Sequence, residues 1–124
     1  MLLLDTNAVI YLQSGRLAAP LEPGEYGISV ITEIELLSFP GLSQNDEELL
    51  KMFFRGVAIL PLDESVKQKA VALRRKHRMK IPDAIICATA IARNALLLTN
   101  DRQLLNIAEV QSMPLLLTPP AGQN

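Results

Sequence analysis

The stretch Leu2-Leu3-Leu4-Asp5-Thr6-Asn7 decides how the rest of the chain is interpreted. An apolar run of this kind indicates a short buried strand, as in a parallel sheet. Thr and Asn directly after an acid favour the start of a helix. In open parallel sheets, ligands bind beyond the carboxyl ends of the strands. Asp5 is therefore either the residue that merely begins the first helix or a functional carboxylate, and this stretch alone leaves both interpretations open.

Length and composition indicate one folded domain over residues 1–124. Hydrophobic residues make up 49% of the chain and charged residues 20%, which favours an aliphatic core over disorder. The single cysteine, Cys87, excludes an internal disulfide and a zinc site built from cysteines. No signal-peptide pattern opens the chain, and no apolar run reaches about 20 residues. We therefore expect a soluble cytoplasmic protein.

The charges are distributed unevenly. The formal net charge of −1 argues against a protein that holds nucleic acid by overall positive charge alone. Residues 67–80 nevertheless contain seven of the 12 lysines and arginines. This basic run is either a solvated helix face or a surface that attracts a phosphate backbone.

Apolar strand patterns alternate with helical patterns along the whole chain. Such alternation predicts a three-layer α/β/α sandwich with a mostly parallel central sheet. We expect Val57–Leu62 to be a second buried strand and Val110 with Leu115–Leu117 to supply the last strand. Further strands are expected at 2–4, 26–29 and 95–99. Helices are expected from 8 to near Gly15, from Ser29 or Thr32 to 37, at 43–56, from 63 into the basic run, from Pro82 to 91, and through 105.

Two of the expected strands end in the same way. Residues 2–7 and 96–101 both place an acid beside Thr and Asn, so Asp5 and Asp101 would emerge at one edge of a parallel sheet. Asp83 opens a helix and could point to the same edge. It could also be an acid that only stabilises the helix dipole.

Glu33 and Glu35 are two residues apart on an expected helix. They would point about 200° away from each other, so only one can face a given site, and the other would be an ordinary surface glutamate.

Several carboxylates crowded together would repel one another unless a cation neutralises them. Oxygen ligands suit Mg²⁺ or Mn²⁺, whereas zinc would bring His or Cys ligands. His77, the only histidine, belongs to the basic run, where we expect a surface role, and Cys87 falls on an apolar helix stripe as a small core residue.

Four short motifs follow one another in a distinctive order: Leu-Leu-Leu-Asp5-Thr-Asn, Ser29-Val-Ile-Thr-Glu-Ile-Glu35-Leu, Pro82-Asp83-Ala-Ile-Ile-Cys-Ala-Thr-Ala, and Leu98-Thr99-Asn-Asp101. Together they resemble the PIN-domain family, especially the small VapC-type toxins of toxin–antitoxin pairs. The resemblance covers essentially the whole chain. It implies a PIN-like fold and a ribonuclease that depends on Mg²⁺ or Mn²⁺.

The resemblance also implies roles for particular residues. Asp5, Glu35, Asp83 and Asp101 match the family's metal-binding and catalytic acids, although the fourth position varies among relatives. Glu33 stands where relatives commonly have an apolar residue, so Glu35 is the better match. Thr6 and Thr99 would orient the carboxylates. The implied partners are an RNA substrate, a cognate antitoxin and a second copy of the chain in a homodimer. Candidates for RNA contacts are Arg74, Arg75, Lys76, Arg78, Lys80 and Arg102.

Two other functions are compatible with parts of the pattern. Phosphatases of the haloacid dehalogenase type also begin with an apolar strand and Asp-Thr, but they resemble an Asp-x-Asp pattern, and position 7 is Asn here. A non-catalytic PIN-like binding module is the other alternative. Because all four acidic positions are filled, the sequence gives no support to lost catalysis.

Overall fold

The computed structural model describes residues 1–119 and has a five-stranded sheet at its centre. The strands stand in the order β3-β2-β1-β4-β5, and every neighbouring pair is parallel. Residues 120–124 of the expected domain lie outside the described residues. The strands are β1 (Leu2–Leu4), β2 (Tyr26–Ser29), β3 (Ala58–Leu60), β4 (Leu96–Leu98) and β5 (Ser112–Met113).

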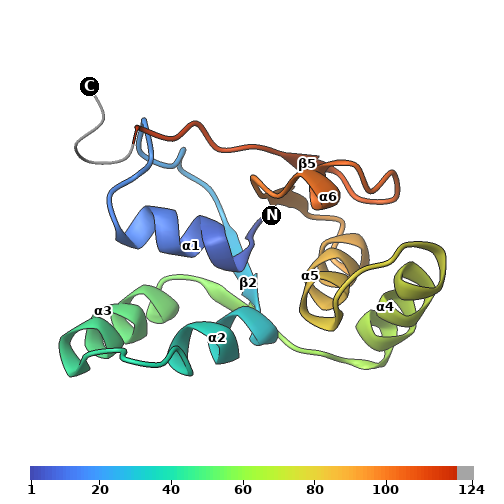
Figure 1. Ribbon diagram of the computed structural model, residues 1–124, viewed down its shortest axis with the longest axis horizontal. Coiled ribbons are helices and arrows are strands. Elements are labelled where there is room, and N and C mark those ends of the chain that lie inside the picture. Colours follow the sequence, from blue (N-terminus) through green and yellow to red (C-terminus); the bar gives the residue numbers. More distant parts are fainter. Residues whose placement is uncertain (120–124) are drawn as a thin grey trace.

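Helices cover both faces of the sheet, which confirms the expected α/β fold. Figure 1 shows α1, α2 and α3 gathered on one side and α4 and α5 on the other. Within residues 1–119, no helix combines the length and the apolar character that crossing a bilayer requires. The helices are α1 (Thr6–Gln13), α2 (Val30–Leu37), α3 (Gln44–Arg55), α4 (Glu64–Lys76), α5 (Ile81–Ala92) and α6 (Arg102–Leu105).

The leucines of β1 point alternately into two hydrophobic clusters, because successive side chains of a strand face opposite sides of the sheet. Leu3 packs in the cluster that contains the apolar residues of α4 and α5. Leu4 packs in the cluster formed with α1, α2 and α3. Both leucines are at most 1% exposed, so this strand is buried on its two faces as expected.

β1 is also the strand at which the order of the sheet reverses. It pairs with β2 on one side and with β4 on the other, and Leu4 lies opposite Leu98. A ligand site is expected where the strand order reverses, beyond the carboxyl ends of the two central strands. The residues that follow Leu4 and Leu98 are Asp5 and Thr99.

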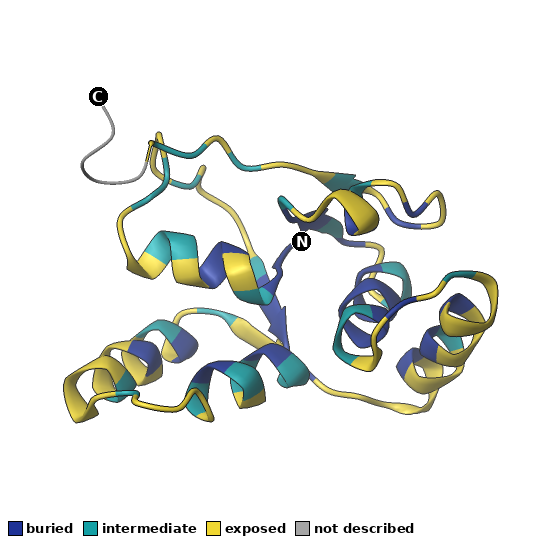
Figure 2. Ribbon diagram, in the orientation of Figure 1, coloured by how far each residue is buried: buried dark blue, intermediate teal, exposed yellow. Residues whose placement is uncertain are grey.

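Helix α5 is the most deeply buried helix of the molecule. All of Ala84–Ala90 is buried, and Figure 2 shows this helix largely in the colour of buried residues. The sequence suggested that Pro82 is the first residue of this helix. The N-cap is Lys80, so Ile81 is the first residue and Pro82 is the second. Proline is tolerated at either position because the first N–H groups of a helix have no partner inside it.

The expectation of a second buried strand at Val57–Leu62 was wrong in two respects. The strand is only Ala58–Leu60, and Ala58 and Ile59 are exposed. β3 is an edge strand that pairs only with β2, so its apolar side chains are only partly covered. An apolar run reports a preference for burial, and it does not say whether the strand lies at the centre or the edge.

The expected last strand was also misplaced. β5 is the pair Ser112–Met113, and Leu115–Leu117 lies beyond it. Pro114 has no N–H to extend the ladder. Leu115 is instead held by the Asn100 side chain, which donates to its carbonyl and accepts from its N–H, both at 2.9 Å. Leu117 forms a single antiparallel bridge with Leu17.

Candidate active site

Asp5 stands between β1 and α1 and is fixed at both carboxylate oxygens. Oδ1 accepts a hydrogen bond from the backbone N–H of Ala8 at 2.7 Å and so caps α1. Oδ2 accepts one from the Thr99 hydroxyl at 2.5 Å. The residue is only 4% exposed. The sequence left open whether Asp5 begins a helix or faces a site, and the structure shows that it caps the helix and also lines a cavity.

Thr99 joins the carboxyl ends of the two central strands. Its hydroxyl donates to Asp5 and accepts from the backbone N–H of Asp101 at 3.1 Å. Asp101 in turn caps α6, because its Oδ1 accepts from the N–H groups of Gln103 and Leu104 at 2.8 and 3.2 Å. The Asp101 carboxylate is therefore anchored through one oxygen, although the residue itself is exposed.

Glu35 reaches the same cavity from α2 and is held by threonines. The Thr6 hydroxyl donates to Glu35 Oε1 at 2.7 Å. Thr6 Oγ1 also lies 3.0 Å from Thr32 Oγ1. Thr6 therefore contacts the glutamate as the sequence suggested, whereas Thr32 was not among the expected site residues. Its position three residues before Glu35 on one helix is the signal that could have indicated it.

Asp83 lines the cavity from the first turn of α5. It is half-buried. The side chains of the other three acids accept hydrogen bonds, whereas the Asp83 carboxylate accepts none from residues 1–119. Burial raises the pKa of Asp83 above its usual value, and the negative charges of Asp101 and Glu35 raise it further. The charge of Lys80 acts in the opposite direction.

These side chains share one small cavity, which we call the carboxylate cavity, of about 140 Å³. Burial raises the pKa of Asp5, the hydrogen bonds from Thr99 and Ala8 lower it, and the charges of Asp101 and Glu35 raise it, so that the pKa lies above its usual value. The cavity thus brings together the four expected acids and holds their charges at a cost. Its lining residues are Asp5, Thr6, Asn7, Glu35, Asp83, Ile86, Asp101 and Leu104.

The donor atoms of the carboxylate cavity fit a hard divalent cation. The lining contains carboxylate, hydroxyl and amide groups and no His, Cys, Lys or Arg. Oxygen donors of this kind select Mg²⁺ or Mn²⁺ over zinc. Within residues 1–119, no group of three or more His, Cys, Asp or Glu side chains could hold an ion as it now stands. Mg²⁺ usually keeps several waters and needs only one or two carboxylates, so a complete protein cage is not required.

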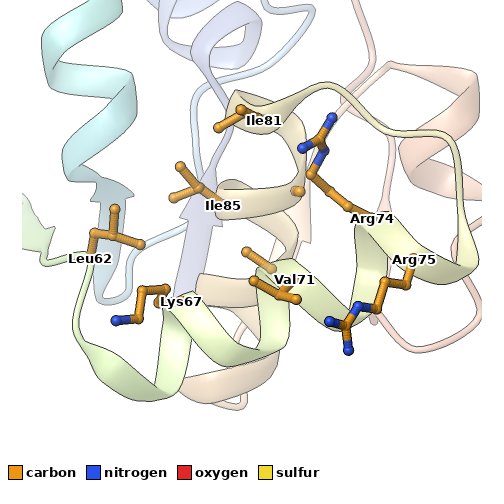
Figure 3. Close-up of a pocket in the computed structure, with 9 residues that line it drawn as sticks. Leu62, Lys67, Val71, Arg74, Arg75, Ile81 and Ile85 are labelled. Carbon is orange, nitrogen blue, oxygen red and sulfur yellow. The ribbon is translucent and has the colours of Figure 1, made fainter.

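The basic run is divided between two places. Arg74 and Arg75 line the α4–α5 groove, a separate cavity of about 530 Å³ whose ends are marked in Figure 3 by Arg74 with Ile81 and by Lys67 with Leu62. The Nε of Arg74 donates to the Met79 carbonyl at 3.1 Å. Lys80 immediately precedes α5, and Arg102 immediately follows Asp101. The remaining candidates, Lys76 and Arg78, are exposed in and just after the end of α4.

Three other residues considered from the sequence, His77, Cys87 and Glu33, do not line the carboxylate cavity. His77 Nε2 lies 3.0 Å from Glu109 Oε2 on the outside of the molecule and does not line the carboxylate cavity. Cys87 is fully buried in the core, as predicted, and burial raises the pKa of its thiol to about 12. Glu33, the alternative glutamate, is not among the residues that line the carboxylate cavity.

The family model of the PIN domain matches residues 2–110. The chain belongs to the PIN-domain family. This family is one of nucleases, and the match confirms the resemblance that the four motifs indicated. A search of curated proteins finds no match.

Solved structures give the same result for the fold. A toxin–antitoxin complex from Klebsiella pneumoniae contains a chain that is 31% identical, with a TM-score of 0.77, over 89% of this chain and 95% of that one. DNA-bound VapBC from Salmonella typhimurium is 22% identical, with a TM-score of 0.77, over 92% and 98% of the two chains. VapBC2 from Rickettsia felis, bound to a promoter DNA fragment, is 21% identical, with a TM-score of 0.74, over 90% and 96%. At such identities the last two similarities concern the fold alone.

Proposed function

We propose that this PIN-domain protein is an endoribonuclease that hydrolyses RNA phosphodiester bonds with Mg²⁺ or Mn²⁺ and acts in the cytoplasm as the toxin of a toxin–antitoxin pair. The observation that carries the proposal is the carboxylate cavity. Four acids from separate segments line it, and burial together with the charges of neighbouring acids raises the pKa of Asp5 and Asp83. A divalent ion is the group that would relieve this repulsion.

The proposed ligands of the ion are Asp5, Glu35, Asp83 and Asp101. When bound, the ion would supply the activation of a water molecule for attack and would offset the negative charge that develops on the phosphate. The chain's own task is to hold the carboxylates in place. Thr99 and the N–H of Ala8 fix Asp5, and Thr6 fixes Glu35.

No protein nucleophile is needed for this mechanism, and the site offers none. A phosphatase of the haloacid dehalogenase type would need a second acid at position 7, and that residue is Asn7. The hydroxyls of Thr6 and Thr99 donate to carboxylates. The Cys87 thiol is buried, and its raised pKa of about 12 keeps it protonated at neutral pH.

The proposal is tested by incubating the purified protein with RNA and Mg²⁺ or Mn²⁺. Cleavage should require the ion and stop in excess EDTA. Asp5→Asn and Asp83→Asn should each lower the rate at least about 100-fold, beyond the usual effect of a residue that only supports a ligand. Asn is chosen because it caps a helix as well as Asp does, so that α1 is retained.

Asp46→Asn is the matched control, since Asp46 is an exposed acid of α3. It should cleave RNA at the wild-type rate. Circular dichroism should show that all three variants are folded. Equal cleavage in excess EDTA, or wild-type activity in both Asp5→Asn and Asp83→Asn, would contradict the metal-dependent mechanism.

We also propose an antitoxin as a protein partner, on the strength of the similar toxin–antitoxin structures. An apolar groove of about 570 Å³ between α1, α2 and α3 shares Thr6 and Glu35 with the carboxylate cavity, so a partner lying in it would cover the acids. Phe39, which is 65% exposed, and Leu42 both line the groove, while Phe54 is a core residue. A small upstream gene whose product copurifies with this chain would support the pairing.

The homodimer suggested by the family resemblance is part of the same proposal. Its measurement is the mass of the purified chain in solution over a range of concentrations. A mass of one chain at every concentration would contradict it.

A further inference from the structure

Thr32 is a fully buried hydroxyl beside the carboxylate cavity. It lies in the first turn of α2 and is 0% exposed. Within residues 1–119, the hydrogen bond of its hydroxyl is to the Thr6 hydroxyl at 3.0 Å. A buried hydroxyl without a partner would be costly, so this contact fixes the Thr32 side chain.

The direction of this hydrogen bond follows from the count of protons. The Thr6 hydroxyl has one proton, and it donates that proton to Glu35 Oε1 at 2.7 Å. An ionised carboxylate can only accept. Thr32 must therefore be the donor to Thr6, and the three residues form a one-way relay from Thr32 through Thr6 to Glu35.

The relay connects two of the acids of the cavity. Thr6 directly follows Asp5 at the start of α1, whereas Thr32 and Glu35 lie one turn apart on α2. The hydrogen bond from Thr6 engages Oε1 of Glu35. With the acceptor site of Thr6 occupied by Thr32, the Thr6 proton is directed toward the glutamate.

We propose that Thr32 is a positioning residue, which acts through the Thr6 hydroxyl to hold Glu35 in the orientation that a divalent ion requires. This inference rests on the proposed function, because it assigns Glu35 to a metal site. Without the Thr32 hydroxyl, Thr6 is free to rotate its proton away from Glu35. Groups that orient metal ligands in this way usually contribute roughly 10- to 100-fold to metal affinity or activity.

The test is a double-mutant cycle read out as Mn²⁺ affinity by calorimetry on the full chain without RNA. Thr6→Val and Thr32→Val should each raise the Kd for Mn²⁺ about tenfold, the lower end of the usual range. If Thr32 acts only through Thr6, the double variant should bind no more weakly than Thr6→Val. Thr32→Ser, which restores the hydroxyl, should bind within about twofold of the wild type.

Thr89→Val is the control for a merely structural effect. Thr89 is as deeply buried as Thr32, at 1% exposed, and its hydroxyl donates to the Ile85 carbonyl within α5 at 2.7 Å. Its replacement removes one buried hydroxyl away from the relay. The Kd of Thr89→Val for Mn²⁺ should equal that of the wild type.

Three results would overturn the role of Thr32: wild-type Mn²⁺ affinity in Thr32→Val, equal weakening in Thr89→Val, or additive effects in the double variant. If Thr32→Val does not fold, the cycle is measured with Thr32→Ala. If the wild type binds Mn²⁺ and cleaves RNA, and Thr32→Val binds Mn²⁺ with the same Kd, this inference is overturned and the proposed function is not. A wild-type protein that binds no Mn²⁺ at millimolar concentration would overturn both the proposed function and this inference.

Discussion

The carboxylate cavity and the α4–α5 groove are built in opposite ways. The cavity takes its acids from four segments that are distant in the sequence and that meet only because of the order of the strands. The groove takes its three basic side chains, Lys67, Arg74 and Arg75, from the single helix α4. The basic residues of the groove lie close together in the sequence on one helix, whereas the acids of the cavity come from two strand ends and two helices that meet at one edge of the sheet. The scattered acids are therefore the stronger sign of a chemical site.

The largest difference between two neighbouring acids is expected within α2, at Glu33 and Glu35. Glu35→Gln should lower RNA cleavage at least about 100-fold, because Glu35 lines the carboxylate cavity and is a proposed ligand. The cleavage rate of Glu33→Gln should stay within about threefold of the wild-type rate, because Glu33 does not line the cavity. Initial rates with Mn²⁺ provide the measurement. Equal losses in the two variants would show that position at the cavity is not what matters.

A smaller effect is expected when the basic residues are removed in pairs. Lys80→Gln with Arg102→Gln should weaken RNA binding about tenfold and lower the salt slope by about 1.4, at roughly 0.7 per lost phosphate contact on a single strand. These two residues adjoin Asp83 and Asp101. Fluorescence anisotropy in EDTA measures binding without cleavage.

The matched pair for this experiment is Arg74→Gln with Arg75→Gln. It removes the same charge from the α4–α5 groove, and we expect at most about a threefold change in RNA affinity and little change in the salt slope. A larger effect from this pair than from Lys80 and Arg102 would place the RNA on the groove and not at the acids.

The smallest effect concerns stability and pH. The pKa of Asp83 is raised in the folded protein by burial and by neighbouring acids. The folded state therefore keeps the proton more firmly than the unfolded state, and stability is lost as pH rises from the ordinary value of 3.8 through the raised pKa. In EDTA, the Tm of the wild type should fall more than that of Asp83→Asn as pH rises from about 3.8 to 7, by about a few degrees.

Metal should reverse this loss. At pH 7, Mn²⁺ at 100 times its Kd should stabilise the wild type by roughly 2.7 kcal/mol. The same concentration should raise the Tm of Asp83→Asn much less. If the Tm of Asp83→Asn depends on pH and Mn²⁺ as that of the wild type does, the Asp83 carboxylate does not take part in the repulsion between the acids of the carboxylate cavity.

Most of the fold could be predicted because its signals are local. Three leucines before an acid, serine or aspartate before a helix, and glycine after one indicated β1, α3 and α4 close to their observed ends. The exceptions are the two edges of the sheet. Burial at an edge depends on which helices cover it, so the apolar run at 57–62 led us to expect a strand longer and more buried than β3. β5 formed from Ser112–Met113, which has no apolar run.

The acids of the site could be proposed from the sequence because strand ends and helix starts converge in a parallel sheet. The relay through Thr32 could not, because a hydroxyl at the start of a helix is equally suited to capping. The division of the basic run could not be seen either, since it depends on where α4 ends and α5 begins. The dual position of Asp5 shows that a helix cap and a site carboxylate are not alternatives.

The central position of β1 has a consequence for the synthesis of the protein. β1 leaves the ribosome before the other four strands of the sheet, yet the strand beside it, β4, begins only at Leu96. A nascent chain that stops before this point lacks Thr99 and Asp101, so it cannot complete the hydrogen bonds that fix Asp5. If the cavity is the nuclease site that we propose, the nascent chain has no assembled site up to this point, while it is held by the ribosome close to the messenger RNA. The proposed site would be complete only after β4, Thr99 and Asp101 have emerged.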